Sequence, residues 1–423
     1  DTPLPEQWAN VLRWLYFDPE WHSRCQAVLD ALNRHGTAIF LSRDHTRRLF
    51  TQDKVSISRL EGFAQCPYRH FVNYGLKPVI RREYEFDPAD VGDFYHAAME
   101  GYAALALKEP DFPDLPDEKI HALMDTVLLP LTTAWTDGPL NETPSLRLQG
   151  EKYRRTVHRA AWMFTHHAQH SRFRTVGEEV VFGEEDGLPP VVLTLHDGRK
   201  IALRGKIDRI DRWEGDEGVY LLVSDYKSSR RDIDPTRLWY GLQLQLLLYL
   251  QAACEGLDGN PAGAFYFTMK DPMVDTADVK EAAEKAIAKK LHLKGIVLAD
   301  VDVVEALDSE PGYSFTKIFN ADSSVASSSD GYTPEEMAAL LAHAKKMAAE
   351  LADRIRSGEI TPSPAVISDW NACQWCDCAG VCKLDTSIPG HEKRELPPLS
   401  KQELLTRMAN DTDAPGNEED TSP

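Results

Sequence analysis

Residues 201–227 read IALRGKIDRIDRWEGDEGVYLLVSDYK, with two strand-like apolar runs on either side of a short polar turn. The turn, Gly215 to Gly218, is rich in residues that tolerate positive φ, which predicts a β-hairpin centred on the middle of the turn. Folding the chain about that centre places Asp208 directly opposite Asp225. Because directly opposed residues share a sheet face with Cβ atoms about 5 Å apart, the hairpin brings two carboxylates together.

This carboxylate pair has the features of a metal site. Lys227 lies two residues beyond Asp225 and therefore points to the same face. Two like charges repel each other unless something positive lies between them, and a divalent metal with hard oxygen ligands is the usual solution. A lone Asp-x-Lys on a strand is also common as a solvated surface pair. The opposed Asp208 and the apolar run 219–223, typical of a buried strand, favour a metal-dependent phosphodiester-cleaving site instead.

Length and composition indicate a globular protein of two or three domains. The chain has 423 residues, 42% of them hydrophobic, and no continuous apolar run long enough to span a membrane. Its first residues, Asp1 to Pro5, are neither a start methionine nor a signal peptide. We therefore expect a soluble, cytoplasmic protein without a membrane partner, cut from a longer chain.

The formal net charge of −20 argues against a protein coated in basic surface. Local charge can differ from the total, and much of the acidity lies in segments expected to be peripheral, such as the tail from Asn410 to Pro423. Basic clusters occur at Arg81-Arg82, Arg154-Arg155, Arg172 to Arg174 and Lys227 to Arg231. The alternative for each cluster is ordinary helix and loop surface.

Cysteine usage predicts a second metal centre. Seven cysteines in a cytoplasmic chain are not expected to form disulfides. Cys373, Cys376 and Cys382 lie too close together in the sequence for a chance arrangement. Three closely spaced thiolates on a short loop after a helix suggest a metal ion or a cluster. A fourth ligand is then needed, since Fe–S clusters and structural zinc both favour four cysteines.

The other cysteines are the candidates for that fourth ligand. Cys25 and Cys254 sit among apolar residues in helical patterns, which is typical of core positions. Cys378 lies only two residues past Cys376, which is short for a separate ligand of one compact site. Cys66 remains, at a break between two predicted helices.

The order of the predicted elements indicates an α/β fold with a mixed sheet. Helices are expected over 5–50, 58–66, 67–75, 87–107, 117–133, 146–173, 237–253 and 333–357. Strands are expected over 179–182, 191–195 and 264–269, in addition to the hairpin. Ser58 and Glu61 form a predicted capping box at the start of the second helix.

Together these features resemble the RecB-like branch of the PD-(D/E)XK nucleases, and within it the C-terminal nuclease domains of AddB subunits from AddAB helicase-nucleases. The motifs that carry the resemblance are Ser56 to Glu61 with Cys66-Pro67-Tyr68, Gly92 to His96, Gly205-x2-Asp208 to Asp211, Asp225 to Ser228, Gln245-x3-Tyr249 and the cysteine loop. The resemblance implies a PD-(D/E)XK core, in which helices flank a mixed central sheet. A four-cysteine cluster would join an N-terminal helical region to a C-terminal strap.

The resemblance also implies the site residues. Its ligands for a catalytic Mg²⁺ or Mn²⁺ are His96, Asp208, Asp225 and the main-chain carbonyl of Tyr226. Lys227 would orient or activate the attacking water, and Gln245 and Tyr249 would position the DNA strand. Its ligands for a structural [4Fe-4S] cluster are Cys66, Cys373, Cys376 and Cys382. Zinc is the alternative at this second site.

The predicted segments follow from the element pattern, the composition and the same resemblance. Residues 1–55 would be a helical remnant of an upstream helicase-like domain, and 385–423, polar and Pro-rich, a disordered acidic tail. The nuclease domain would occupy 56–384, with a helical part at 56–175, a catalytic core at 176–310, and a C-terminal helix and cysteine loop at 333–384.

The expected function is a metal-dependent deoxyribonuclease that cuts a single strand delivered by a helicase during double-strand break resection. An AddA-like helicase-nuclease subunit would be the partner. No Gly-x4-Gly-Lys-[Ser/Thr] occurs in the sequence, so ATP hydrolysis is not expected here. One alternative is a DNA-binding scaffold with negligible cutting on its own. Another is a free-standing Fe–S nuclease of the CRISPR-adaptation type.

Overall fold

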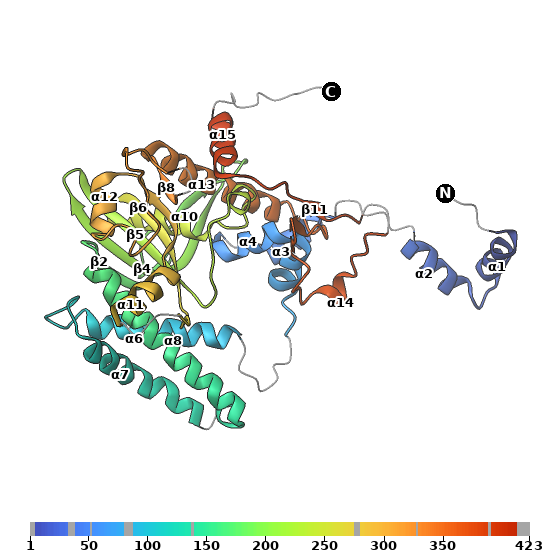
Figure 1. The fold of residues 1–423 in the computed structure, drawn as a ribbon. Coiled ribbons are helices and arrows are strands. Elements are labelled where there is room, and N and C mark those ends of the chain that lie inside the picture. The colour runs from blue at the N-terminus through green and yellow to red at the C-terminus, as the bar shows by residue number, and fades with distance from the viewer. Residues whose placement is uncertain are drawn as a thin grey trace. The chain divides into compact units, whose positions relative to one another are not determined.

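The computed structural model describes residues 5–32, 39–50, 53–79, 88–136, 139–274, 280–326, 329–387 and 391–412 (Figure 1). The chain forms two compact units, and each of them combines residues from several of the predicted segments. The cysteine unit comprises Asp1–Thr51, Gly62–Pro78 and Arg354–Pro397. The sheet unit comprises Gln52–Glu61, Val79–Asp353 and Pro398–Pro423. The origin of residues 1–55 in an upstream domain stays a prediction.

The sheet unit is built on a mixed sheet, as predicted. Among the described residues its eight strands are β1 (Lys54–Ser56), β2 (Arg174–Phe182), β3 (Val192–Thr194), β4 (Lys200–Gly215), β5 (Gly218–Lys227), β6 (Asn260–Thr268), β7 (Lys294–Leu298) and β8 (Gly331–Tyr332). They follow the order β1-β4-β5-β6-β7-β8, and β2 and β3 also pair with β4. The β1/β4, β5/β6 and β7/β8 pairs are parallel, whereas β4/β5 and β6/β7 are antiparallel.

The predicted hairpin is confirmed as the β4/β5 pair. Gly215 pairs with Gly218 and Arg209 pairs with Ser224, so the register is the one expected from the turn. Continuing that register by one residue places Asp208 opposite Asp225. Nearly all of β5 is buried, which agrees with its continuous apolar run.

Three long helices pack together beside the sheet. They are α6 (Pro88–Ala106), α7 (Asp117–Thr136) and α8 (Pro144–Gln169), and all three were expected from the sequence. Figure 1 shows them side by side, and α6 also contacts β2 and β5. Buried aromatic side chains such as Phe164 of α8 and Phe267 of β6 fill the core of this unit.

The helix predicted over 237–253 is wrong as a single element. The structure has two helices there, α9 (Pro235–Trp239) and α10 (Gln245–Leu257). Gly241 lies in the break with φ +73°, and a Cβ at this position would lie 2.8 Å from Cγ of Met347. The apolar pattern runs through the break because Leu242 and Leu244 are buried like helix residues, so periodicity could not reveal it.

The remaining helices include two that contribute residues to both units, α4 (Ile57–Gln65) and α13 (Pro334–Arg356). The start of α13 is held by a capping box, because Thr333 Oγ1 accepts from the Glu336 N–H and a Glu336 carboxylate oxygen accepts from the Thr333 N–H. The sheet unit also contains η2 (Pro139–Asn141), α11 (Lys280–Lys290) and α12 (Val301–Leu307).

The cysteine unit combines short helices with a small sheet. Its helices are α1 (Glu6–Phe17), α2 (His22–Leu32), α3 (Arg43–Leu49), α5 (Pro67–His70), the π-helix η1 (Phe71–Leu76) and α14 (Ala379–Cys382). Its sheet has the order β10-β9-β11, from β9 (Ala365–Ile367), β10 (Trp370–Asn371) and β11 (Arg394–Glu395).

The predicted disorder of 385–423 is wrong for residues 391–412. β11 pairs with β9 in the cysteine unit, and α15 (Lys401–Thr412) packs in the sheet unit. Leu404 and Met408, one helical turn apart, are buried, so a short apolar stripe is enough to order this polar segment. Residues 413–423 lie outside the described residues.

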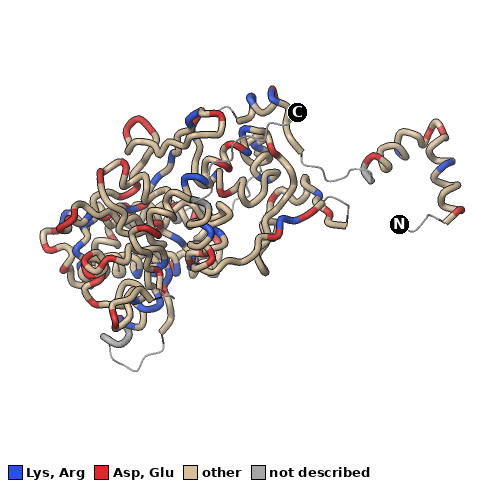
Figure 2. Tube along the Cα trace, turned by 90° about the horizontal axis from the view of Figure 1, so that it is seen from above, with Lys and Arg blue, Asp and Glu red and all other residues tan. Residues whose placement is uncertain are grey.

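Charges of both signs are interspersed along the chain (Figure 2). The predicted basic cluster Arg81-Arg82 lies outside the described residues. Two of the other clusters make ordinary contacts: Arg155 faces Asp271 at 3.8 Å, and the Arg172 guanidinium lies 5.2 Å from the centre of the Trp213 ring. Within the described ranges, none of the helices combines the length and apolar character needed to cross a bilayer.

Candidate active site

Asp208 and Asp225 meet in the buried middle of the sheet, at the position that the hairpin predicts. Asp208 is 6% exposed and Asp225 1%. Oδ2 of Asp208 accepts a hydrogen bond of 2.6 Å from the Tyr226 N–H. Burial, and next the charge of Asp225, raises the pKa of Asp208 to about 7. Two buried carboxylates that resist joint ionisation are a suitable host for a divalent cation.

His96 reaches this pair from α6, as the family resemblance implied. Its Nδ1 lies 3.6 Å from Oδ1 of Asp208 and 3.2 Å from Oε1 of Glu179 on β2. Burial would lower the pKa of His96, but the hydrogen bond to Glu179 and the nearby carboxylate charges outweigh burial and raise it. One donor atom each from His96, Glu179 and Asp208 lies within 4.8 Å of the others, which is the spacing of ligands around one ion.

Glu179 is a site residue that sequence reasoning missed. The β2/β4 register pairs Glu178 with Arg209 and Val180 with Ile207, so Glu179, whose φ is +53°, lies between these pairs at the level of Asp208. Three neighbouring strands therefore place Glu179, Asp208 and Asp225 in one row. The signal in the sequence was an acidic residue at the start of the predicted strand 179–182, but no tight turn joins β2 to β4, so their register could not be read.

Lys227 and Gln245 both contact Asp225. The Lys227 ammonium forms a close ion pair with Oδ2 of Asp225, and its side chain is 19% exposed. Nε2 of Gln245 donates to Oδ1 of Asp225 and to the Tyr249 hydroxyl, each at 3.0 Å. Gln245 and Tyr249 are one turn apart on α10, so the structure brings together the residues predicted for this part of the site.

A glycine allows Tyr249 to approach β4. A Cβ on Gly205 would lie 2.6 Å from the Phe182 ring and 3.1 Å from Cε1 of Tyr249. Any larger residue at this position would push the Tyr249 ring or β2 away from the carboxylates. The glycine in the Gly205-x2-Asp208 motif thus has a packing reason.

Glu61 holds the start of α10, which the predicted capping box did not anticipate. Oε1 of Glu61 accepts hydrogen bonds from the N–H groups of Leu244 and Gln245, at 2.7 and 2.9 Å. The start of α4 is capped by Ser56 instead, whose Oγ accepts from the Arg59 N–H. Burial raises the pKa of Glu61 to about 7. Glu61 therefore links α4 to the residue that contacts Asp225.

The opposite face of these strands carries a buried polar network. The Tyr226 hydroxyl donates to Oε2 of Glu178 at 3.2 Å, so the side chain of Tyr226 is anchored while its main chain lies beside Asp208. The Arg209 guanidinium donates to Asp211 and Ser224 and lies 4.9 Å from the centre of the Phe164 ring. These contacts join β2, β4 and β5 and fix their relative register.

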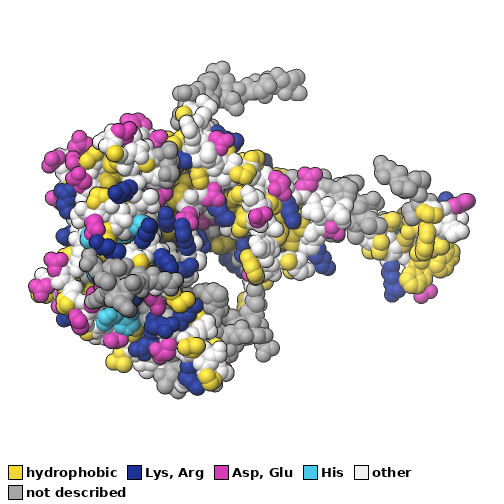
Figure 3. All heavy atoms as spheres, viewed as in Figure 1, with side chains coloured by type: hydrophobic (Ala, Val, Ile, Leu, Met, Phe, Trp, Pro, Cys, Tyr) yellow, Lys and Arg dark blue, Asp and Glu magenta, His cyan; other side chains and the backbone are white. Residues whose placement is uncertain are grey.

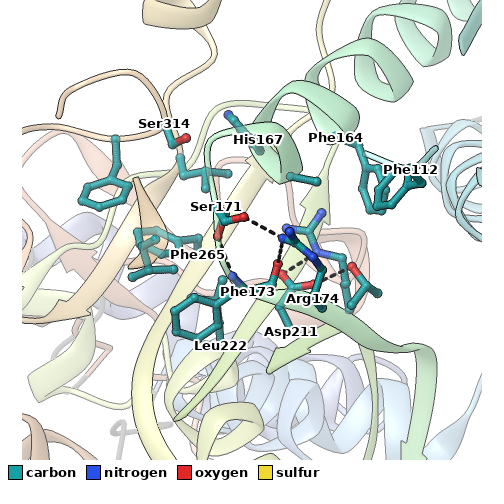
Figure 4. A pocket seen from close by; sticks show the side chains of 16 residues that line it. Phe112, Phe164, His167, Ser171, Phe173, Arg174, Asp211, Leu222, Phe265 and Ser314 are labelled. Atoms are coloured by element: carbon teal, nitrogen blue, oxygen red, sulfur yellow. Dashed lines mark hydrogen bonds and ion pairs between the residues drawn. The ribbon is translucent and has the colours of Figure 1, made fainter. Parts of the chain in front are cut away.

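A small internal cavity borders this network (Figure 4). Its volume is about 40 Å³, and its lining includes Phe164, His167, Arg209, Asp211 and Ser314. A cavity of this size has room for a few water molecules and not for a nucleotide. It belongs to the core behind the carboxylates and not to the active site.

The predicted cluster cysteines meet around one hollow in the cysteine unit. A cavity of about 230 Å³ is lined by Cys66, Cys373, Cys376, Cys378 and Cys382. Cys25 on α2 and Cys254 on α10 do not line it, as their helical patterns suggested.

The contents of this hollow can be judged from its size and its sulfur donors. Its volume of about 230 Å³ leaves room for more than one atom among the thiols. Burial, and next the neighbouring thiolates, raises the pKa of Cys373 and Cys382. Several thiolates can therefore coexist here only with a cation. Cys378, set aside by its spacing, is buried and faces the same cavity, so geometry alone leaves five candidates for four ligands.

The mixed sheet, the opposed aspartates and the Asp225-Tyr226-Lys227 sequence define a nuclease of the (D/E)-x-K class. The chain belongs to the PD-(D/E)XK nuclease superfamily, whose profile matches residues 54–383.

Over nearly its whole length the chain is also similar to proteins named as the B subunit of an ATP-dependent helicase/deoxyribonuclease. The protein from Alkaliphilus metalliredigens is 31% identical over 425 residues, covering 97% of this chain and 37% of that protein. The protein from Acetivibrio thermocellus is 32% identical and covers 96% of this chain and 36% of that protein. The protein from Moorella thermoacetica is 36% identical and covers 93% and 35%. The chain thus spans little more than a third of the length of the curated relatives it matches.

Proposed function

We propose that the sheet unit is a Mg²⁺- or Mn²⁺-dependent deoxyribonuclease that hydrolyses phosphodiester bonds in a single DNA strand. The observation that carries this proposal is the row of Glu179, Asp208 and Asp225 on adjacent strands, with His96 above it and Lys227 beside it. Hard oxygen donors, one imidazole and a neighbouring ammonium are the groups that phosphodiester hydrolysis needs.

The residues fit a divalent cation, and we assign its ligands to His96, Glu179, Asp208, Asp225 and the main-chain carbonyl of Tyr226. A cation bound there would polarise the phosphate and lower the pKa of a bound water. Glu179 is added to the predicted set because its carboxylate lies as close to His96 as that of Asp208 does.

The remaining side chains position the reactants. Lys227 is close enough to Asp225 to hold a water beside that carboxylate. Its ammonium would also offset the negative charge on the oxygens when the phosphorus becomes five-coordinate in the transition state. Gln245 fixes the rotamer of Asp225 through its amide and aligns the Tyr249 hydroxyl toward the same point. Glu61 fixes Gln245 in turn through the first N–H groups of α10.

We further propose a [4Fe-4S] cluster on Cys66, Cys373, Cys376 and Cys382, with a structural role. Such a cross-link closes a loop of about 300 residues, and on chain-entropy grounds it would stabilise the fold by roughly 5 kcal/mol. A brown preparation with visible absorbance and bound iron would support this proposal. A colourless preparation with stoichiometric zinc would overturn it.

The relatives' name supports a place in a helicase–nuclease complex, where a motor subunit would deliver the strand during end resection. An AddA-like subunit is the expected partner, and DNA the expected substrate.

The deciding experiment is a cleavage assay on end-labelled single-stranded DNA with Mg²⁺, Mn²⁺ or EDTA. Wild type should cut with either metal, and Asp225→Asn should not. Asp216→Asn is the matched control, because it makes the same change in the exposed turn of the same hairpin and should retain full activity. Equal cutting by wild type and Asp225→Asn would refute the proposal. DNA binding without metal-dependent cutting would favour the scaffold alternative.

A further inference from the structure

Two cations lie in line with Asp208 on strand β4. Along this strand Ile201, Leu203 and Ile207 are buried, whereas Arg204 and Lys206 are exposed. Because side chains alternate between the faces of a strand, Arg204 and Lys206 share the face of Asp208. Successive members of this row are about 7 Å apart along the strand. The row therefore runs from solvent directly to the carboxylate at the centre of the site.

A third cation extends the row from the neighbouring strand. β1 pairs with β4 so that Ser56 lies beside Arg204 and Lys54 beside Ala202. The side chains of Lys54, Arg204 and Lys206 are 45%, 47% and 53% exposed, so all three ammonium or guanidinium groups reach solvent. Figure 3 shows Lys and Arg side chains collected in patches on the face in view, so the net negative charge leaves room for local positive surface.

The three cations already hold anionic oxygens. The Glu184 carboxylate bridges Lys54 at 2.9 Å and Arg204 at 3.1 Å, and these two contacts lower the pKa of Glu184. The Lys206 ammonium contacts the Glu179 carboxylate at 2.5 Å. The side chain of Glu184 is 40% exposed, and solvent screening leaves exposed ion pairs of this kind with little net stabilisation. A phosphate offers the same charge and more acceptor oxygens, so it can replace Glu184 at little cost.

We propose that Lys54, Arg204 and Lys206 form a phosphate-binding track that holds the DNA strand on one side of the scissile phosphate. The proposal rests on the proposed nuclease function and adds to it the residues that hold the substrate backbone. Arg204 and Lys206 are two residues apart on the strand, so they can meet separate phosphates, whereas Lys54 shares with Arg204 the phosphate that replaces Glu184. Glu184 occupies the outer phosphate position in the free protein and competes with the strand for it.

The test measures salt dependence, because each phosphate contact contributes a fixed increment to it. The affinity of the full chain for a fluorescent oligo-dT is followed by anisotropy between 50 and 300 mM KCl, with Ca²⁺ replacing Mg²⁺ to prevent cutting. For single strands the slope of log K against log salt is about −0.7 per phosphate neutralised. Arg204→Gln and Lys206→Gln should each reduce the slope by about 0.7, and the double variant by about 1.4. Glutamine keeps a polar side chain and removes the charge.

Two further variants make the test specific. Arg212→Gln is the matched control: Arg212 lies on the same strand, 41% exposed, but beyond Asp208 and separated from it by the buried Ile210. Its slope should equal that of wild type. Glu184→Gln removes the competing carboxylate and should tighten binding several-fold at low salt.

The outcomes separate the track from the proposed function. If wild type cuts DNA with Mg²⁺ but the Arg204 and Lys206 variants keep the wild-type slope, the track is wrong and the nuclease stands. If Arg212→Gln lowers the slope as much as they do, binding is unspecific and the track is also wrong. If wild type does not cut DNA, the nuclease proposal fails whatever the slopes. In cleavage assays Arg204→Gln, which does not contact a proposed metal ligand, should raise KM and leave kcat nearly unchanged.

Discussion

The carboxylate row of the sheet unit and the cysteine hollow of the cysteine unit are the two proposed metal-binding regions, and they are built in opposite ways. The row uses oxygen and imidazole donors on strands and a long helix, and its aspartates are almost fully buried. The hollow uses sulfur donors on loops and short helices, and Cys373 is exposed. Hard donors on rigid elements suit a cation that must act on phosphate, whereas soft thiolates suit a cluster that ties chain segments together.

The contrast predicts that each region can be damaged without the other. Replacing Glu179 or Asp208 by its amide should lower the cleavage rate by about 100-fold or more, because each removes charge that the active site places beside the phosphate and cation. For Asp208→Asn, stability in EDTA should stay unchanged or rise, because burial and the charge of Asp225 already disfavour the ionised Asp208 carboxylate. Single-turnover cleavage and urea unfolding measure the two effects. Normal cleavage by Glu179→Gln would remove this residue from the site.

Substitutions in the cysteine hollow should have the opposite effect, because they should lower stability and not act directly on cleavage. Cys66→Ser or Cys376→Ser should release bound iron and lower the free energy of unfolding by several kcal/mol, because the long loop is no longer closed. Cys254→Ala is the control, since this residue lies on α10 away from the hollow. Iron content and thermal unfolding are the measurements. If Cys66→Ser and Cys254→Ala lose equal stability with iron unchanged, the hollow is not a cluster site.

A substitution at Glu61 should have an intermediate effect on cleavage, because Glu61 acts on the carboxylate row only through α10. Glu61→Ala leaves the first N–H groups of α10 without their acceptor, so Gln245 should lose its position and kcat should fall by roughly tenfold or more. Glu61→Gln retains a carbonyl oxygen as acceptor and should recover most of the rate. A merely structural role would predict that both variants change stability while kcat is unaffected.

The smallest expected effect concerns the charge of Glu61. Burial raises its pKa from 4.5 to about 7, against the hydrogen bonds from the Leu244 and Gln245 N–H groups and the nearby charges of Arg231 and Lys227, which lower it. Because the folded state binds this proton more tightly than the unfolded chain, the stabilisation present below about pH 4.5 is lost as the pH rises to about 7. Between pH 5 and 8, Glu61→Gln should therefore lose about 1–3 kcal/mol less stability than wild type. Urea unfolding at both pH values measures this difference, and parallel pH dependence would contradict it.

Two pairs of neighbouring carboxylates show which parts of the site could be predicted from the sequence and which could not. Asp208 and Asp225 are joined by one tight turn, and the turn alone sets their register. Glu179 and Asp208 also lie at one level on neighbouring strands, but β3 and a long connection separate their strands, so the pairing depends on the packing of the whole sheet. The break between α9 and α10 was not predicted, for a related reason. Leu242 and Leu244 are buried by tertiary contacts, so the apolar pattern looks like that of a continuous helix.

Local sequence by itself determined the hairpin, the helices α6 to α8, the close spacing of three cysteines that line the hollow and, through family resemblance, the nuclease class. Each of these depends on residues near one another in the chain or on a recognisable motif. Only the tertiary structure decided that Glu179 completes the carboxylate row, that Glu61 caps α10, that a fifth cysteine faces the hollow, and that residues 401–412 form a helix. These features join segments far apart in sequence, and their geometry is set by the packing of the core.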